Sequence, residues 1–328
     1  MTEAVATANA NVALAKYWGK RDESLNLPYT GSISITLAGL TTTARVRFSA
    51  ARDLDRVLMS GMEAEGVEAQ RVSAFLDLVR QRAGEEPRAE VEIASNFPVA
   101  AGLASSASTF AALALAATRA LGLSLSPREM SVLARRGSGS AARSIFGGYV
   151  EWQPGEASDG SDSYAVQLAP AQHWPLGIVA AITDLGRKPV GSREGMAQAL
   201  KRSPFFPAWL QSHDADLEAI RHAVLARDLA TAGLVAESNC LKMHAVSLAS
   251  SPPLLYWNPT TVAVIQRVHQ LREEGTQAYF TIDAGPQVKI ICPLAERDAV
   301  AAAIRRVPGV HDVLLSEPGD GARVVESA

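Results

Sequence analysis

Residues 96–108 read Asn-Phe-Pro-Val-Ala-Ala-Gly-Leu-Ala-Ser-Ser-Ala-Ser, and this stretch decides the fold because it joins a strand to a helix. Before it, residues 90–93 alternate between charged and apolar types, which predicts a strand. After it, residues 105–121 are rich in alanine and predict a buried helix. The small residues between them let a ligand approach the backbone, and the N–H groups that open the helix favour an anion. A capped helix on a Gly/Ala-rich turn explains the same pattern equally well.

This segment is not a Walker A loop. No Gly-Lys-Ser/Thr occurs, and Gly19-Lys20 is followed by Arg21. If the loop binds phosphate, its serine hydroxyls add donors and can reach a phosphate-bound Mg²⁺.

Periodicity along the rest of the chain predicts an α+β fold, with strands and helices mixed in each half. The pattern changes near residues 184–191, so we expect an N-terminal lobe of residues 1–186 and a C-terminal lobe of residues 187–328. The expected strands are residues 32–37, 42–48, 90–93, 147–152, 178–183, 278–282, 288–292 and 310–315. The expected helices with both ends defined are residues 68–82, 105–121, 260–272 and 296–306. A further helix begins at Ser126-Pro127, and residues 208–249 form two helices with a break near Arg227-Asp228.

Composition excludes several classes of protein. A chain of 328 residues, 48% of them hydrophobic, is longer than one hydrophobic core usually accommodates, so we expect two lobes or domains. Its net charge of -3 gives no general positive surface potential that would favour nucleic-acid binding. Two cysteines are too few for a disulfide scaffold. The N-terminal residues lack an export signal, and the longest uncharged stretch, residues 93–118, is interrupted by polar residues, proline and glycine. We therefore expect a soluble cytoplasmic protein with no membrane or nucleic-acid partner.

A second motif, residues 135–144, reads Arg-Arg-Gly-Ser-Gly-Ser-Ala-Ala-Arg-Ser. Gly137-x-Gly139-x-x-Ala142 mimics a dinucleotide fingerprint, but a predicted helix precedes it where that fingerprint requires a strand. Arg143 lies among small residues, a setting in which a guanidinium can hold a carboxylate by two hydrogen bonds. The alternative is an exposed structural arginine.

Two further segments carry charged residues in suggestive positions. In residues 11–22, Lys16 and Lys20 are spaced to share one helical face, with Tyr17 between them in sequence. They could bind a phosphorylated substrate, although the spacing alone favours a solvated charge run over Lys20-Arg21-Asp22-Glu23. Asp283 ends a predicted strand before Gly285-Pro286, which suits a catalytic base or metal ligand, or equally an aspartate that caps the turn. Histidine spacing indicates no zinc site.

Taken together, these segments resemble the diphosphomevalonate decarboxylases, members of the GHMP kinase superfamily. The resemblance rests on blocks that occur in the family's order: Asn11-x-x-x-x-Lys16-Tyr17-Trp18-Gly19-Lys20-Arg21-Asp22, the segment from Asn96 to Ala107, residues 135–144, Gly147-Gly-Tyr-Val-Glu-Trp152 and Asp283-Ala-Gly-Pro286. It implies a two-lobed α+β fold with the active site in the cleft between the lobes, and usually a homodimer.

The resemblance also implies roles for individual residues. Asp283 would orient or deprotonate the substrate's tertiary hydroxyl, with Lys16 close by, and Arg143 would hold the substrate carboxylate with help from Asn11. ATP and Mg²⁺ would be bound by Asn96, Gly102, Leu103, Ala104, Ser105, Ser106 and Ala107, with Ser106 on the metal. The substrate and its phosphorylated tail would be lined by Tyr17, Lys20, Ser138, Ser140, Arg143, Ser192, Arg193 and Met196.

The implied activity is the ATP-dependent conversion of mevalonate 5-diphosphate to isopentenyl diphosphate, ADP, phosphate and CO₂. The chain departs from the family pattern at Tyr29-Thr30-Gly31, where Asn-Ser is usual, at Ala142 in place of Cys, and at Gln287 in place of Asn. Because the first change bears on substrate contacts, mevalonate 5-phosphate is an alternative substrate. A mevalonate 3-kinase and a non-catalytic sensor on the same scaffold are further alternatives.

Overall fold

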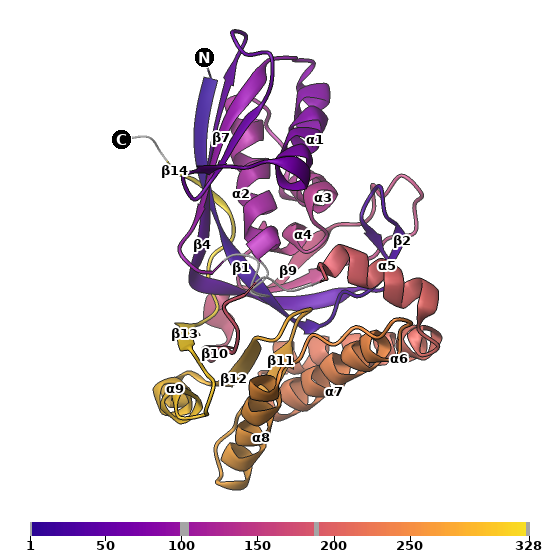
Figure 1. The fold of residues 1–328 in the computed structure, drawn as a ribbon, viewed down its shortest axis with the longest axis vertical. Coiled ribbons are helices and arrows are strands. Elements are labelled where there is room, and N and C mark those ends of the chain that lie inside the picture. Colours follow the sequence, from indigo (N-terminus) through magenta and orange to yellow (C-terminus); the bar gives the residue numbers. More distant parts are fainter. Residues whose placement is uncertain (1, 99–104, 187–189, 326–328) are drawn as a thin grey trace.

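The computed structural model describes residues 2–98, 105–186 and 190–325, and it has the α+β architecture expected (Figure 1). One sheet, called here the N-terminal sheet, has the strand order β14-β1-β4-β7-β5-β6, with β8 paired to β4 and β9 to β8. Its strands are β1 (Thr2–Ala15), β4 (Ser32–Ser49), β5 (Arg56–Met59), β6 (Met62–Glu63), β7 (Arg88–Ser95), β8 (Tyr149–Trp152), β9 (Ala165–Ala169) and β14 (Arg323–Val325).

The long antiparallel pair of β1 and β4 forms the centre of this sheet. The strands expected at residues 32–37 and 42–48 are one continuous strand, so the predicted break between them is wrong. The pairing with β1 shifts register between Thr36 and Thr41, and Gly39 lies in this irregularity with φ of 78°. Ile33, Ile35 and Leu37 on one face of this strand are buried, and so are Ser32, Ser34 and Thr36 on the other. No strand was predicted at β1, whose alternation uses mainly alanine.

Helices cover one side of the N-terminal sheet (Figure 1). They are α1 (Gly66–Ala83), α2 (Ser105–Ala120), α3 (Pro127–Gly137) and the short α4 (Ala141–Ser144). Helix α2 is buried almost all round, as its alanine content predicted, and it packs on β1 and β4. Helix α3 begins with the predicted cap: the Ser126 hydroxyl accepts from the Glu129 N–H, and the Glu129 carboxylate accepts from the Ser126 N–H.

The second sheet, called the C-terminal sheet, has the order β11-β12-β10-β13. Helices α6 and α7 break at the predicted position, where Arg227 is left-handed (φ 59°) and Asp228 caps α7. The elements of this half are β10 (Leu176–Ile182), α5 (Ser192–Arg202), α6 (Phe206–Ala226), α7 (Leu229–Leu248), α8 (Pro259–Glu273), β11 (Tyr279–Ile282), β12 (Val288–Pro293), α9 (Arg297–Arg305) and β13 (Asp312–Ser316). Among the described helices, none combines the length and apolar character needed to cross a bilayer.

A shared hydrophobic core joins the two halves. Val12 on β1 and Ile35 on β4 belong to the same buried cluster as Ile178 on β10, Ile220 on α6 and Ala236 on α7. Each sheet also contains a strand from the other half of the chain. Strand β10 comes before residue 186 but lies in the C-terminal sheet, and β14 comes after residue 186 but pairs with β1 in the N-terminal sheet. The ends of β1 and β11 are thereby brought to one junction.

The segment after β1 is not helical, so the prediction that Lys16 and Lys20 share a helical face is wrong. Lys16 follows the last residue of β1, and Lys20 begins β2 (Lys20–Asp22), which pairs with β3 (Leu27–Pro28). Both lysines are buried, whereas Arg21 and Asp22 are half-buried and Glu23 is exposed, so the solvated charge run expected at residues 20–23 is wrong for Lys20 and holds only toward its acidic end. Gly19 has φ of 106°, a value that requires glycine, and it turns the chain from Lys16 toward this hairpin.

Candidate active site

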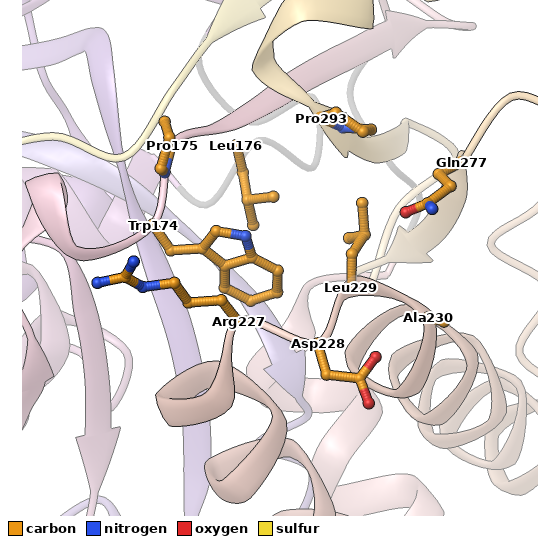
Figure 2. Close-up of a pocket in the computed structure, with 9 residues that line it drawn as sticks. All are labelled: Trp174, Pro175, Leu176, Arg227, Asp228, Leu229, Ala230, Gln277 and Pro293. Carbon is orange, nitrogen blue, oxygen red and sulfur yellow. The ribbon is translucent and has the colours of Figure 1, made fainter.

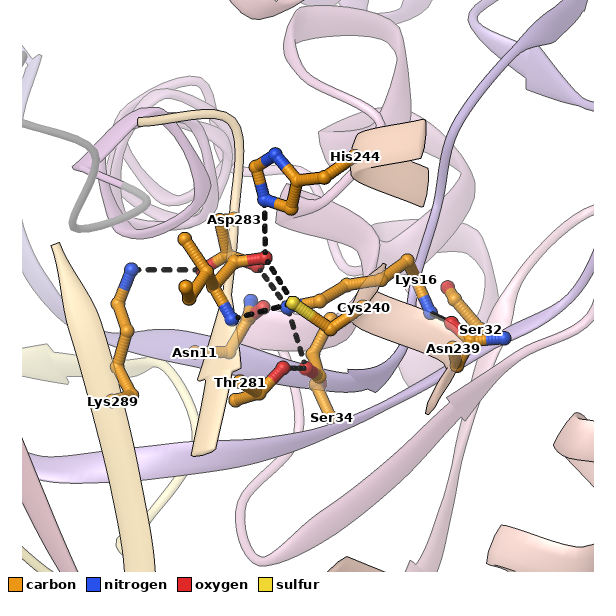
Figure 3. Close-up of polar contacts among 12 residues, drawn as sticks. Asn11, Lys16, Ser32, Ser34, Asn239, Cys240, His244, Thr281, Asp283 and Lys289 are labelled. Atoms are coloured by element: carbon orange, nitrogen blue, oxygen red, sulfur yellow. Dashed lines mark hydrogen bonds and ion pairs between the residues drawn. The ribbon is translucent and has the colours of Figure 1, made fainter. Parts of the chain in front are cut away.

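Asp283 lies at the junction of the halves, directly after β11 (Figure 3). Its Oδ1 lies 2.7 Å from the Lys16 Nζ and its Oδ2 lies 3.2 Å from the Lys289 Nζ. The Lys16 and Lys289 side chains are 2% and 3% exposed, whereas 22% of the Asp283 side chain remains accessible. The carboxylate is therefore the part of this cluster that an incoming molecule can reach.

Opposing effects set the charge of Asp283. Burial favours the neutral acid, but the positive charges and hydrogen bonds of Lys16 and Lys289 outweigh it and hold the pKa of Asp283 well below its usual range. The carboxylate is thus ionised at neutral pH and is a weak base. It is well suited to accept a hydrogen bond from a hydroxyl and to stabilise nearby positive charge.

Neutral groups from α7 pack beside this cluster. Burial, with help from Lys16, lowers the pKa of His244 to about 3, and burial raises the pKa of Cys240 to about 11. The Cys240 Sγ accepts from the Ile282 N–H at 3.1 Å, which anchors the end of β11 beside Asp283. Asn239 on the same helix accepts from the Lys16 backbone N–H at 2.8 Å. Helix α7 therefore fixes both Asp283 and Lys16.

Arg143 on α4 is 2% exposed, so the alternative of an exposed structural arginine is excluded. Its Nε donates to the Ser34 Oγ (2.9 Å), and its terminal nitrogens donate to the Ser32 Oγ (2.5 Å) and the Asn11 Oδ1 (3.1 Å). Ser32 and Ser34 share one face of β4, because side chains alternate along a strand. Burial lowers the pKa of Arg143 to about 10, so it stays charged at neutral pH.

The partners of Arg143 are all uncharged. Three hydrogen bonds use three of the five N–H donors of a guanidinium, so two have no partner among the described residues. Asn11 is itself fixed by donating to the Ser144 Oγ at 2.8 Å. A buried cation whose hydrogen-bond partners are all neutral, and which makes no direct ion pair with a described acid, suits a ligand carboxylate.

The hydroxyl groups of Ser106, Ser138 and Ser140 lie close together between α2 and the turn that follows α3. The Ser138 Oγ donates to the Ser106 Oγ at 3.2 Å and lies 3.4 Å from the Ser140 Oγ. Tyr17 packs edge-on against Trp152 with ring centroids 4.7 Å apart, and its buried hydroxyl has no hydrogen-bond partner among the described residues. The hydroxyl groups of these residues thus form a lining of neutral groups that can donate hydrogen bonds.

A group of cations borders this lining. The Lys20 Nζ donates to the Asn26 Oδ1 at 2.7 Å, and burial together with the charges of Arg193 and Arg71 lowers the pKa of Lys20 to about 8. Burial and the charge of Arg193 also lower the pKa of Arg71. Mutual repulsion of this kind is relieved when an anion binds. Arg71 was not predicted from the sequence, because nothing in the pattern of α1 distinguishes it from a solvated helical arginine.

The expected ATP-binding residues lie in different settings. Ser105, Ser106 and Ala107 form the first turn of α2, which contains no acid. The Asn96 amide is occupied in a turn: its Oδ1 accepts from the Thr41 N–H at 2.9 Å and its Nδ2 donates to the Gly39 carbonyl at 2.8 Å. Gly102, Leu103 and Ala104 lie outside the described residues.

The remaining predicted residues are on α5, which the sequence did not predict as a helix. Ser192 and Arg193 open α5, and the buried Met196 packs in a cluster with Trp18 and Tyr256.

The departures from the family pattern are accommodated locally. A Cβ at Gly31 would come within 2.7 Å of Leu217, and the Gln287 Oε1 accepts from the Thr183 N–H at 2.6 Å.

The described residues provide no cluster of protein ligands for a metal ion. Within residues 2–98, 105–186 and 190–325, there is no group of three or more His, Cys, Asp or Glu side chains that could hold an ion. A surface depression of about 360 Å³ lies elsewhere, lined by Trp174, Arg227 and Asp228 among others (Figure 2), and contains none of the predicted site residues.

Comparison with known proteins covers almost the whole chain. Residues 8–165 match the diphosphomevalonate decarboxylase-like N-terminal domain, and residues 178–318 match the mevalonate 5-diphosphate decarboxylase C-terminal domain. The diphosphomevalonate decarboxylase of Candida albicans is 37% identical over 94% of this chain and 90% of its own length.

Solved structures agree with the sequence matches. The mevalonate diphosphate decarboxylase of Staphylococcus aureus superposes with a TM-score of 0.94 at 38% identity, covering 99% of this chain and 98% of the other. MDDEF, solved in complex with MVAPP, AMPPCP and magnesium, superposes with a TM-score of 0.93 at 37% identity, covering 99% of each chain.

Proposed function

The chain belongs to the diphosphomevalonate decarboxylase family, and we propose on this premise which of its residues perform each part of the reaction. It is an ATP-dependent decarboxylase with a GHMP kinase-like fold, and it converts mevalonate 5-diphosphate to isopentenyl diphosphate, ADP, phosphate and CO₂. The observation that carries this conclusion is the match of both family models, in order, over nearly the whole chain.

Asp283 is proposed to receive the substrate's tertiary hydroxyl. The accessible, ionised carboxylate accepts the hydroxyl's hydrogen bond and so orients its oxygen toward the phosphoryl donor. When phosphate departs from the tertiary carbon, positive charge develops there, and the fixed negative charge of Asp283 stabilises it. Lys16 holds the carboxylate in place through a 2.7 Å ion pair.

Arg143 is proposed to bind the substrate carboxylate. Its two unused N–H donors match the two oxygens of that group, and Asn11, Ser32 and Ser34 fix the guanidinium plane. Holding the carboxylate aligned with the departing group favours loss of CO₂ once the leaving group forms.

ATP and Mg²⁺ fit the first turn of α2. That turn has no acid, and the Ser106 hydroxyl lies 3.2 Å from the Ser138 hydroxyl, so hydroxyl and N–H donors converge without a competing negative charge. When bound, ATP with Mg²⁺ supplies the phosphoryl group that turns the tertiary hydroxyl into a leaving group. We propose that Ser105, Ser106 and Ala107 hold it, with Ser106 nearest the metal, together with Gly102, Leu103 and Ala104; Asn96 supports the adjoining turn.

The diphosphate tail is proposed to lie among the donors and cations beside Tyr17. Lys20, Ser138, Ser140, Ser192 and Arg193 would contact it, and Met196 would pack against the substrate's carbon chain. Arg71 joins this set, since its charge and that of Arg193 both depress the pKa of Lys20.

Replacing Arg71 with Met is expected to raise the KM for mevalonate 5-diphosphate about tenfold, with kcat within about threefold of the parent, because a phosphate contact far from the reacting carbon contributes to binding. Steady-state kinetics with varied substrate measures this. Arg128→Met is the matched control, because Arg128 stacks on Tyr164 as Arg71 stacks on Phe110, but away from these cations. An unchanged KM for Arg71→Met would remove Arg71 from the substrate site.

Substrate choice is tested with mevalonate, its 5-phosphate and its 5-diphosphate, each with ATP, while CO₂ and phosphate are followed separately. We expect stoichiometric CO₂ and phosphate from the 5-diphosphate. Turnover confined to the 5-phosphate would indicate the alternative decarboxylase. Phosphorylated product without CO₂ would indicate a kinase, and no turnover of any substrate would favour the non-catalytic sensor.

The larger organisation is also proposed. Residues 1–186 and 187–328 would be the N-terminal and C-terminal lobes, with β10 and β14 crossing between the two sheets. The family resemblance supports a homodimer, and the scarcity of cysteine in the sequence supports a cytoplasmic location.

A further inference from the structure

Lys289 is a charged residue in an apolar strand. It lies in β12, whose neighbouring residues Val288, Ile290 and Ile291 are all buried, and its own side chain is 3% exposed. Burying an ammonium group is costly unless a partner compensates it. The identity of that partner therefore indicates why the lysine is there.

The pairing of β11 with β12 directs Lys289 to the active site. Lys289 lies opposite Thr281 in the antiparallel register, so the two side chains point to the same face. Asp283 follows Thr281 by two residues, directly after the end of β11. The Lys289 Nζ reaches the Asp283 Oδ2 at 3.2 Å (Figure 3).

The two oxygens of Asp283 are held by different lysines from different halves of the chain. Lys16, which follows β1, binds Oδ1 and also donates to the Ala13 carbonyl at 2.9 Å, so its ammonium is fixed from behind. Lys289 binds Oδ2 from the C-terminal sheet. A single lysine would leave the carboxylate free to rotate about its last bond, whereas two anchors fix its plane.

We propose that Lys289 is a positioning residue for the decarboxylation: together with Lys16 it holds the Asp283 carboxylate ionised and fixed in plane, with its accessible face toward the substrate hydroxyl. This inference rests on the role given to Asp283 in the proposed function and adds to it a residue that does not itself touch the substrate.

The charges that face Asp283 determine the effect of removing Lys289. They are Lys16 after β1, Lys289 on β12 and Arg143 on α4, while His244 and Cys240 on α7 are neutral. Burial lowers the pKa of Lys289 itself, and the charge of Asp283 opposes that shift. Without Lys289, Lys16 and Arg143 still favour ionisation of Asp283, but its pKa rises. Because activity requires the ionised carboxylate, activity is then lost at a higher pH on the acidic side.

The test compares Lys289→Met and Lys289→Arg with the parent enzyme in the decarboxylation assay. For Lys289→Met we expect kcat to fall about 10²-fold with the KM for substrate within about threefold, since positioning affects the chemical step more than binding. The acidic limb of the kcat profile should move up by about one pH unit, the shift expected for loss of one adjacent charge. Lys289→Arg should show the acidic limb of the kcat profile at the same pH as the parent enzyme, because arginine keeps the positive charge.

Cys292→Ala is the matched control on the same strand. Cys292 is buried and its thiol contacts the Gly177 carbonyl, so its truncation perturbs β12 without changing the charge near Asp283. We expect it to lower Tm while leaving the acidic limb in place. If Lys289→Met behaves like Cys292→Ala, with parental kcat and limb, Lys289 has only a packing role and the proposal is wrong. If Lys289→Met fails to fold, Lys289→Gln, which keeps a donor without the charge, is measured with the same expected shift.

A ligand-free measurement separates this inference from the proposed function. The ¹³Cγ signal of Asp283, assigned by its loss in Asp283→Asn, is titrated in the parent and in Lys289→Met, and a higher pKa is expected in the variant. An unchanged titration in an enzyme that decarboxylates its substrate would overturn the role of Lys289 alone. Absence of decarboxylation in the substrate panel would overturn the proposed function, while the titration would still report on the contact.

Discussion

Asp283→Asn lowers kcat by at least about 10³-fold while ATP still binds, because the amide keeps the shape of the side chain but loses the negative charge that faces the tertiary carbon. The neutral side chain also leaves Lys16 and Lys289 without a carboxylate between them. The measurements are steady-state turnover of mevalonate 5-diphosphate and calorimetric titration with an ATP analogue.

Asp55→Asn is the matched control for this change. Asp55, just before β5, has a buried side chain that pairs with Arg80 of α1 at 2.9 Å and also accepts from the Ala89 N–H on β7. Its loss should lower Tm, since removing one partner of a buried pair costs about 3–5 kcal/mol, yet leave kcat close to the parent value. Turnover of Asp283→Asn within tenfold of the parent would remove the carboxylate from the chemistry.

Arg143→Lys is expected to lower kcat/KM by about 10²-fold, because a lysine keeps the charge but cannot reproduce the planar fork that Asn11, Ser32 and Ser34 orient. A substrate carboxylate that is bound but misaligned should also separate the two halves of the reaction. We therefore expect the ratio of CO₂ to ADP to fall below one, measured by trapping CO₂ and coupling ADP release in the same reaction.

Arg221→Lys provides the comparison for Arg143→Lys. Arg221 on α6 makes a two-pronged contact with Glu151 on β8, at 2.8 and 2.7 Å, and neither residue is among the groups that hold Asp283. The same chemical change there should leave both kcat/KM and the CO₂ to ADP ratio unaltered. A parental ratio and rate for Arg143→Lys would show that the carboxylate is held elsewhere.

The sequence was informative where a local signal marks a residue of the candidate site. Asp283 was found because it ends a strand before a Gly-Pro turn, and Arg143 because small residues surround it. The break between α6 and α7 and the cap of α3 were also predicted, since residues close in the chain determine them. Strand β1 was not, because its buried positions 4, 6, 8 and 10 are all alanine and give little hydrophobic contrast.

Contacts made across the fold could not be predicted in this way. In the sequence, Lys289 is a single charged residue within an apolar strand, and nothing near it in the chain indicates a role. Only the register of β11 and β12 shows that it lies opposite Thr281 and beside Asp283. Arg71 becomes part of the cationic group only when α1 packs near the turn at Gly137, whose carbonyl it contacts at 3.3 Å. Lys16 and Lys20 were assigned to a helix because their spacing fits one, whereas Gly19 directs the chain into a hairpin.

The pairing of β14 with β1 has a consequence for biosynthesis. Val325 lies opposite Val5, and the segment before it is joined to the first half by the Asn9 Nδ2 to Asp320 carbonyl bond and by the bridge between Leu37 and Pro318. During translation, β1 therefore emerges from the ribosome some three hundred residues before its outer neighbour. Until then its open edge can pair with other nascent chains, so chaperone protection should matter most late in synthesis.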